Sequence, residues 1–260
     1  MYIKPYDELT IQDNFIFQKV MRNKRICKQT IERLLDIDIK DISYPEEEKS
    51  INVRLDSKSI RLDVYVNDDK GTVFNIEMQT TKDMDELVKR TRYYQGLIDI
   101  DNIEKGQNYS ALHDTYIIFI CTFGVFTGKR HKYTFRNLCI EDNEILLNDG
   151  TTKLFLSTKG EADDVSKPLK MFLDYVDGKK PEDALMQEID HEVDTVKHCD
   201  EWRRDYMTLA LEMDKKWREG KAEGKIEAIR NAIKDGLTTL AAVKKSGRYT
   251  EEEIAAIAAP

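Results

Sequence analysis

The chain has 260 residues, of which 40% are hydrophobic and 35% charged, enough apolar material for a domain of roughly 150 residues with its own core. Only 12 glycines and 5 prolines are present, which excludes a collagen-like or low-complexity class. The formal net charge of −8 excludes a globally basic nucleic-acid-binding protein, although a local basic groove stays open.

Membrane and secretory classes are not expected either. The best apolar run, residues 116–126, is too short to cross a bilayer and suits a buried strand. The first residues lack the basic and apolar regions of a secretory signal. Four scattered cysteines form no C-x-x-C pair, so we expect free thiols in a reducing cytoplasm. The four histidines show no metal-ligand spacing, and we expect them to be solvated.

The first half of the chain predicts a helix followed by strands. Apolar residues at helical spacing predict a helix over residues 8–36. Alternation of apolar and polar residues then predicts three strands, over 51–55, 60–66 and 74–78. Asp68–Gly71 has the composition of a turn between the last two strands. These segments therefore predict a three-stranded meander or a close relative of one.

The next segments complete a mixed α/β core. Residues 82–104 are predicted as a helix that Gly106 ends. Residues 115–126 are predicted as a central strand covered on both faces. Further strands are expected over 131–137 and 154–157, so that the core ends near residue 160.

The C-terminal part is predicted to be helical and strongly charged. After a short helix at 167–177, one or two long helices are expected over 183–233, with an apolar stripe formed by Trp202, Tyr206, Leu209 and Met213. This stripe could be buried on the core or could form a homodimer, and the sequence leaves both open. Gly220 and Gly224 lie on one helical face and would permit a close helix–helix approach.

Two short helices are predicted at the end of the chain, over residues 237–245 and 251–259, the second with a capping box at Thr250 and Glu253. They could be taken for a helix-turn-helix motif. Acids at the start of the second helix would repel phosphates, so packing or partner binding is the favoured interpretation.

A pair of carboxylates in the meander carries the strongest chemical signal. Asp63 lies on the polar face of its strand, and Glu77 and Gln79 lie on the polar face of theirs. If Asn67 pairs with Val73, the register sets Asp63 opposite Glu77, at about 5 Å between Cβ atoms. Like charges there are destabilising unless a cation lies between them, and oxygen ligands suit Mg²⁺ or Mn²⁺. An ordinary solvated strand face is the alternative.

The order of several motifs resembles one known family. Residues 61–63 and 76–79, which contain Asp63 and the E-M-Q element, resemble the PD-(D/E)XK nuclease superfamily, and more narrowly the Rpn-type recombination-promoting nucleases, also described as transposases. Further segments resemble the R-x-x-Y-Y, G-x-x-Y-x-x-L and D-x-x-F-K motifs of that family: residues 90–94, 106–112 and 13–19, the last with altered Phe–Lys spacing. The resemblance covers residues 5–160 well and the tail loosely.

The resemblance implies a fold and a metal site. The fold is a restriction-endonuclease-like α/β core, a mixed β-sheet flanked by helices, with a helical C-terminal extension. Asp63 and Glu77 would ligate Mg²⁺ or Mn²⁺, with the backbone carbonyl of Met78 as a further ligand. Gln79 stands where many members have lysine, and glutamine can orient the scissile phosphate but brings no charge to it.

Other roles stay open among several residues. The missing positive charge is expected from one of three residues: Lys82, Arg90 and Arg92. Arg90 could equally cap an acid such as Glu77, and both roles are compatible. The acid that the superfamily carries on its first helix has two candidates here, Asp13 and Glu32.

The implied activity is metal-dependent hydrolysis of DNA phosphodiester bonds by a cytoplasmic endonuclease linked to recombination and transposition. We expect a nuclease-like domain over residues 1–180, a charged helical segment over 181–235 and a helical tail over 236–260. DNA is the expected partner, and the C-terminal helices could also form a homodimer. The rival interpretations are a DNA-binding module without efficient cleavage and a regulatory protein that acts through its C-terminal helices.

Overall fold

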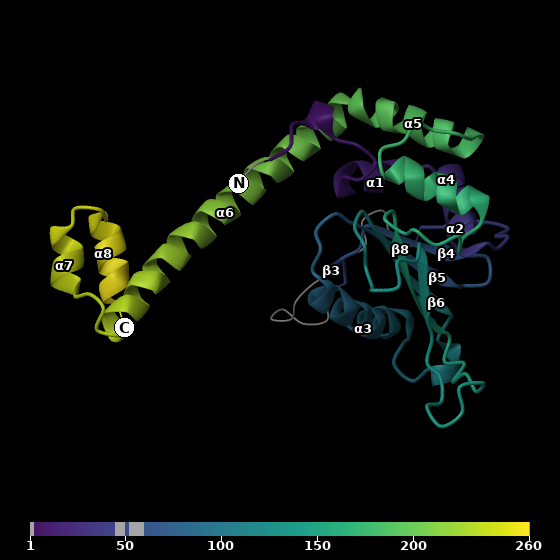
Figure 1. Ribbon diagram of the computed structural model, residues 1–260, viewed down its shortest axis with the longest axis horizontal. Coiled ribbons are helices and arrows are strands. Elements are labelled where there is room, and N and C mark those ends of the chain that lie inside the picture. Colours follow the sequence, from purple (N-terminus) through teal and green to yellow (C-terminus); the bar gives the residue numbers. More distant parts are fainter. Residues whose placement is uncertain (1–2, 45–49, 52–59, 260) are drawn as a thin grey trace. The chain divides into compact units, whose positions relative to one another are not determined.

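A mixed six-stranded sheet organises Asp7–Cys199 in the computed structural model, which describes residues 3–44, 50–51 and 60–259 (Figure 1). The strands run in the order β1-β4-β5-β6-β8-β7, and β5, β6 and β8 are mutually parallel. Their bounds are β1 Ile42–Ser43, β4 Val64–Asp68, β5 Val73–Gln79, β6 Thr115–Cys121, β7 Lys132–Phe135 and β8 Thr151–Ser157. A separate two-stranded sheet pairs β2 (Ser50–Ile51) with β3 (Ile60–Arg61).

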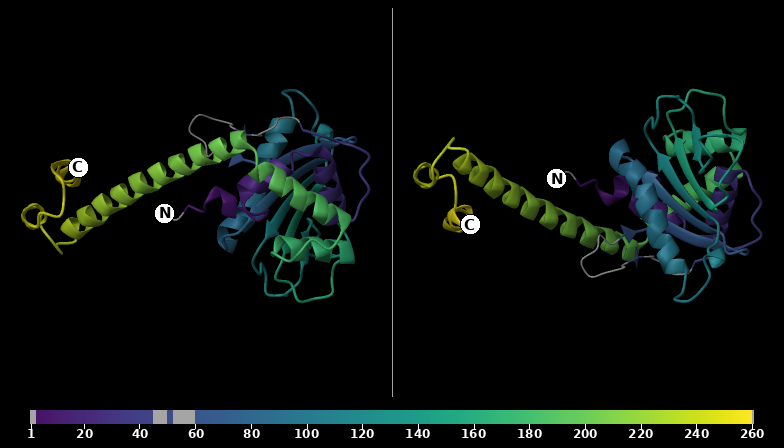
Figure 2. Two further views of the ribbon diagram at one scale, coloured as in Figure 1. Left: turned by 90° about the horizontal axis from the view of Figure 1, so that it is seen from above. Right: turned by 90° about the horizontal axis from the view of Figure 1, so that it is seen from below.

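Helices cover both faces of this sheet, and Figures 1 and 2 show the resulting layers. On one face lies α3 (Met84–Asn102). On the other lie α1 (Asn14–Val20), α2 (Lys24–Leu35), α4 (Lys167–Val176) and α5 (Ala184–Lys197). Both faces of β5 and β6 are therefore dry, which explains their nearly continuous burial and confirms the expected central strand and restriction-endonuclease-like α/β architecture.

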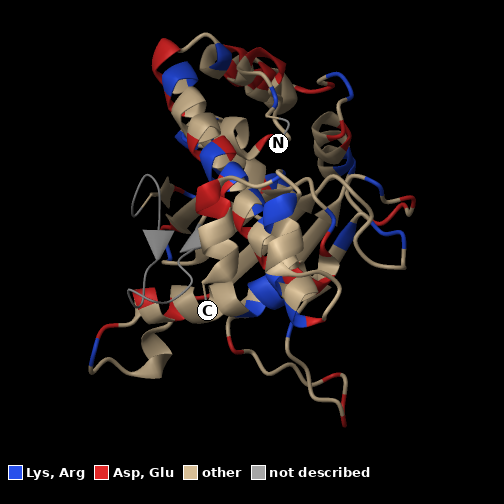
Figure 3. Ribbon diagram, turned by 90° about the vertical axis from the view of Figure 1, so that its left-hand side faces the viewer, with Lys and Arg blue, Asp and Glu red and all other residues tan. Residues whose placement is uncertain are grey.

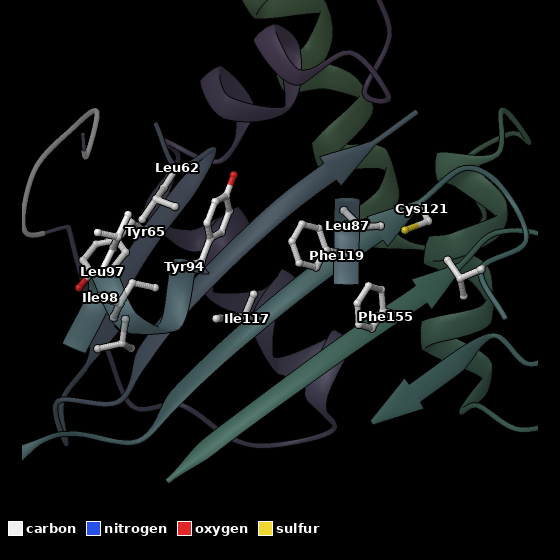
Figure 4. Packing of buried hydrophobic residues seen from close by; sticks show 12 residues of the cluster. Leu62, Tyr65, Leu87, Tyr94, Leu97, Ile98, Ile117, Phe119, Cys121 and Phe155 are labelled. Carbon is white, nitrogen blue, oxygen red and sulfur yellow. The ribbon is translucent and has the colours of Figure 1, made fainter. Parts of the chain in front are cut away.

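The hydrophobic core between α3 and the sheet combines aliphatic side chains with stacked aromatic rings (Figure 4). Tyr94 of α3 lies above Phe119 of β6, with ring centroids 6.3 Å apart. Phe119 stacks on Phe155 of β8 at 5.4 Å. Offset aromatic pairs add roughly 0.5–1.5 kcal/mol each beyond the area that they bury. This cluster fixes α3 against the central strands.

The helix expected over residues 8–36 is wrong as one element. A 3₁₀ turn at Tyr6–Glu8 precedes α1, and α2 starts afresh after a turn. Asn23 has extended backbone angles, and its side chain accepts a hydrogen bond from the Ile26 amide at 3.4 Å. The N-cap preference of asparagine at this position ends the first periodic segment and begins the second.

The strand expected over residues 60–66 is also interrupted. β3 ends at Arg61 and β4 begins at Val64, so that Leu62 and Asp63 lie between two different sheets. The expected three-stranded meander is wrong for this reason. The strand expected over 51–55 falls mostly on residues 52–59, outside the described part of the chain.

The expectation of solvated histidines is wrong for His131. Its side chain is only 2% exposed, and its Nδ1 lies 2.8 Å from the Ala162 carbonyl oxygen and 3.1 Å from Asp164 Oδ1. The loop after β8 brings both groups over the ring. Polar sequence neighbours therefore did not predict solvent exposure here.

A second unit consists of residues 3–6 together with 200–259. Its main element is α6 (Asp200–Lys234). In the N-terminal half of α6, the Tyr206 hydroxyl donates to the Lys4 carbonyl at 2.6 Å. The short helices α7 (Leu240–Lys245) and α8 (Glu251–Ala258) complete it, and α8 begins with the expected capping box. Lys225 of α6 pairs with Glu253 of α8 at 2.9 Å.

The first unit extends to Cys199. The cause is α5, which packs on α1 and α2 and places Asp183 Oδ2 2.6 Å from Arg33 Nη1. Likewise α7 and α8 pack with α6 rather than forming a separate tail. Among the described residues, no helix combines the length and the apolar character needed to span a membrane.

Replacement of Phe74 tests the packing of the sheet against the helices on one of its faces, which are α1, α2, α4 and α5. Phe74 is fully buried and stacks on Tyr116 at 5.4 Å. Phe74→Ala should lower the free energy of unfolding by about 3–5 kcal/mol, measured by urea denaturation. Ile140→Ala is the control, because Ile140 is 87% exposed and its loss should change stability by at most about 0.5 kcal/mol. Equal effects of the two changes would contradict this packing.

Candidate active site

Two carboxylates meet where β4 begins beside the end of β5. The ladder pairs Asn67 with Val73 and Val64 with Ile76, which confirms the predicted register. Asp63 precedes this ladder by one residue, and its amide donates to Glu77 Oε1 at 3.2 Å. In return, the Met78 amide donates to Asp63 Oδ2 at 3.1 Å. Each carboxylate thus binds the main chain of the other strand.

Glu77 is an ionisable group in the dry layer beneath α3. Its side chain is 2% exposed. Burial, and then the neighbouring Asp63 charge, raise the pKa of the Glu77 carboxyl well above its ordinary value. The Asp63 amide, Arg90 and Asn75 act in the opposite direction. With its amide nitrogen facing the acceptors, Asn75 donates to Glu77 Oε1 and to the Val64 carbonyl, each at 3.2 Å.

Arg90 of α3 joins the polar residues of β5. Its Nη2 lies 3.2 Å from Glu77 Oε2, and its Nη1 donates to Gln79 Oε1 at 3.1 Å. Nη2 also donates to the Tyr94 hydroxyl at 2.6 Å, one helical turn away, and the guanidinium lies over the Tyr94 and Phe119 rings. The interpretation of Arg90 as a cap on Glu77 is confirmed. Burial raises the pKa of Tyr94 to about 12, so its hydroxyl stays neutral beside these charges.

Gln18 of α1 is a site residue that sequence reasoning missed. Its Nε2 donates to Asp63 Oδ1 at 2.8 Å and so fixes the carboxylate from the other side. The available signal was the altered Phe–Lys spacing in the segment 13–19, because Gln18 is the residue between Phe17 and Lys19. A contact across 45 residues cannot be read from that spacing alone.

The two candidates for a first-helix acid are engaged elsewhere. Asp13 Oδ2 accepts from the Thr10 amide at 2.7 Å in the turn before α1. Glu32 Oε1 binds Lys28 Nζ at 2.7 Å and the Ile39 amide at 2.9 Å. Glu32 therefore closes the turn after α2, and α1 supplies the amide of Gln18 to Asp63 instead of an acid.

The other two basic candidates are solvent-exposed. Lys82 lies in the connection between β5 and α3, and Arg92 lies on the exposed side of α3. Contact of either residue with a DNA phosphate stays a prediction.

The donor set of the carboxylate pair fits a small divalent cation. Among the described residues, no group of three or more His, Cys, Asp or Glu side chains is arranged so that it could hold a metal ion. Mg²⁺ does not need one, because it commonly keeps several waters and binds through one or two carboxylates. Asp63 and Glu77 supply two carboxylates that are held next to each other by main-chain hydrogen bonds, and oxygen donors of this kind suit Mg²⁺. A cation here would also offset the repulsion that raises the pKa of Glu77.

A comparison with protein families agrees with this geometry. The model of the PD-(D/E)XK nuclease family transposases matches residues 14–158, more than half of the chain. The chain belongs to this family. The match spans α1 through the end of β8 and confirms the predicted resemblance to PD-(D/E)XK, Rpn-type proteins. Neither the curated proteins nor the solved structures contain a significant match.

The raised pKa of Glu77 makes stability depend on pH in this PD-(D/E)XK protein. The unfolded chain ionises Glu77 near its ordinary pKa, whereas the folded state keeps the proton to higher pH. The contribution of Glu77 to the free energy of unfolding should therefore be greatest at low pH and should fall as pH rises through its folded-state pKa. Glu77→Gln keeps the neutral form and should be more stable than wild type at about pH 8 in EDTA.

Urea denaturation at several pH values checks this expectation. The difference between wild type and Glu77→Gln should vanish as pH falls to about 4.5, where the unfolded chain also takes up the proton. Exposed Glu104 offers a control, because Glu104→Gln makes the same chemical change at a solvent-exposed position. A destabilised Glu77→Gln protein at every pH would contradict the assigned cost of ionising Glu77.

Proposed function

We propose that this protein is a divalent-metal-dependent endonuclease that hydrolyses DNA phosphodiester bonds. The observation that carries the proposal is the interlocked Asp63–Glu77 pair, with Gln79 and Arg90 beside it. Membership of the PD-(D/E)XK nuclease family supports a nuclease-like activity on DNA. Metal dependence follows from the chemistry of the donor set.

Asp63 and Glu77 would hold Mg²⁺ or Mn²⁺, with the Met78 carbonyl as a third protein ligand. Such a cation acidifies a bound water and offsets the charge that develops on the phosphate. Gln18 keeps Asp63 Oδ1 in place by its hydrogen bond, and the Met78 amide does the same for Oδ2. The carboxylate is thus oriented before substrate arrives, which preserves the geometry that in-line attack requires.

Gln79 and Arg90 together replace the lysine of many superfamily members. The Gln79 amide oxygen accepts from Arg90 Nη1, so the glutamine orients a cation that α3 supplies. An arginine here can stabilise a phosphate oxygen by charge and by directed hydrogen bonds. Gln79 then acts as a positioning residue and Arg90 carries the charge.

The remaining parts of the proposal concern setting and contacts. Exposed Lys82, in the β5–α3 connection, and exposed Arg92, on α3, would contact DNA phosphates. A chain of net charge −8 needs such local basic contacts to bind DNA. The family description supports a role in recombination or transposition. We place this activity in the cytoplasm on the sequence argument from unpaired cysteines. We further propose that the chain forms a homodimer through α6.

One observation favours a second candidate, a DNA-binding module that cleaves poorly. Arg90 Nη2 binds the Glu77 oxygen that would face a cation, and Gln79 lacks the charge of lysine. Under this alternative, DNA affinity would fall steeply with salt because phosphate contacts release counterions, but no strand would be cut.

Conversion of supercoiled plasmid tests the proposal. With Mg²⁺ or Mn²⁺ the wild type should nick the plasmid, and EDTA should abolish nicking. Asp63→Asn should lower the rate by at least about 100-fold, because it removes one of two anionic ligands. Asp85→Asn, an exposed acid in the first turn of α3, should cleave like wild type. Cleavage by a folded Asp63→Asn protein at the wild-type rate would sink the proposal, and no cleavage by any variant would favour the binding module.

A double-mutant cycle tests the coupling of Gln79 to Arg90. Arg90→Gln and Gln79→Ala should each slow cleavage by roughly 10–100-fold. If Gln79 acts by orienting Arg90, the double variant should be no slower than Arg90→Gln alone, because coupled residues are not additive. Multiplicative losses would show that Gln79 acts independently. Metal dependence should be measured for all four proteins, since Arg90 also binds Glu77.

A further inference from the structure

The long helix α6 carries an exposed apolar face. None of its 35 residues is buried. Met213 and Trp217 are 41% and 43% exposed, and both lie on the same side of the helix as Leu209. Most helices in proteins depend on packing for their stability rather than on propensity, so a helix of about 50 Å with this face calls for a partner.

Side-chain size changes along this face. The N-terminal half presents Leu209 and Met213, whereas the C-terminal half presents Gly220, Gly224 and Ala228. A Cβ atom added to either glycine would meet no atom within 4 Å. Each glycine has a lower helix propensity than alanine, and within the described part of the chain no neighbouring group packs on this face to offset that cost.

The charges of α6 change in the same direction. Residues 200–214 contain five acids and two basic residues, a net charge of −3. Residues 215–234 contain seven basic residues and three acids, a net charge of +4. This asymmetry complements the helix dipole, and it also makes each half of α6 complementary to the other half of a second copy.

The small helices of the second unit leave the glycine face uncovered. α8 contacts α6 through Lys225, which pairs with Glu253, and through Arg230, which donates to the Ala256 carbonyl at 3.1 Å. Lys225 and Arg230 lie roughly 100° or more round the helix from Gly224. Figure 3 marks the basic residues in blue and the acidic residues in red.

We propose that α6 packs antiparallel against α6 of a second copy, with the two-fold axis close to Trp217. In this register Met213 of one copy lies against Gly220 of the other, and Leu209 lies against Gly224. The large residues of each half then fill the space above the glycines of the other. Glu212 of one copy also approaches Lys221 of the other. The inference rests on the self-association proposed above and not on DNA cleavage.

Side-chain size and charge along α6 both favour antiparallel pairing. A parallel pair would align glycine with glycine and leave Met213 facing Met213. It would also align the −3 halves with each other and the +4 halves with each other, which is unfavourable. Size and charge along the helix therefore favour the same orientation, and an isologous interface is the common arrangement for a dimer of identical chains.

Sedimentation equilibrium of the full chain tests the surface. The wild type should be dimeric, and Gly220→Leu/Gly224→Leu should raise the dimer dissociation constant at least about tenfold, because leucine fills the space that Leu209 and Met213 need. Leucine also raises helix propensity, so melting of α6 cannot explain the loss. Ala222→Leu, on the opposite face of the same turn, should stay dimeric. A monomeric wild type, or equal effects of both variants, would overturn the proposed surface.

Disulfide cross-linking tests the orientation. Cys139 and Cys199 are replaced by serine, while Cys27 and Cys121 stay, because they are buried and burial raises the pKa of both thiols to about 12. Trp217→Cys, near the axis, should form a covalent dimer on oxidation. Gly224→Cys should not, since its two copies would lie about 20 Å apart along the helices. A covalent dimer from both variants would contradict the antiparallel register while retaining self-association.

Plasmid cleavage by the same samples separates this inference from the nuclease proposal. Dimers that link at residue 217 but cut no DNA would leave the α6 pairing intact and defeat the nuclease assignment. Monomers that cleave DNA would overturn the α6 pairing and leave the nuclease assignment intact.

Discussion

Glu77 is an ionisable side chain on a central strand, in a layer that α3 closes to water. Its ionised form is unfavourable there because of burial first and the Asp63 carboxylate second. Nearby groups each lower that cost: the Asp63 amide, the Asn75 amide and the Arg90 guanidinium all direct positive charge or an N–H group at it. The polar groups in an otherwise hydrophobic layer surround this carboxylate.

The sheet and the helices each contribute one part of the arrangement. Because β4 begins only at Val64, Asp63 lies outside the ladder, and its carboxylate accepts a hydrogen bond from the Met78 amide. α1 supplies Gln18 from one face, and α3 supplies Arg90 from the other. The two carboxylates that would hold a cation under the proposed function are thus positioned from both faces of the sheet. The PD-(D/E)XK family fold therefore positions the proposed chemistry through ordinary strand register and helix packing.

The parts that could be predicted from sequence are those that local patterns determine. Period-two alternation and a turn between β4 and β5 determined the pairing of Asn67 with Val73, and hence the meeting of Asp63 with Glu77. The break at Leu62 and Asp63 could not be predicted in this way. At that point the Asp63 carboxylate, and not the main chain of a neighbouring strand, accepts the hydrogen bond of the Met78 amide. Gln18 was also missed, since its contact depends on how α1 packs on the sheet. His131 was missed because loops that follow β8 bury it.

Direct binding of Mn²⁺ tests the central claim that Asp63 and Glu77 form one cation site. Titration of the full chain, followed by the electron paramagnetic resonance signal of free Mn²⁺, reports stoichiometry and affinity without any DNA. The account predicts one bound ion per chain, with binding weakened at least about tenfold in both Asp63→Asn and Glu77→Gln, and weakened in Gln18→Ala as well. Binding of equal affinity to the wild type and to Asp63→Asn, or no binding to the wild type, would contradict it.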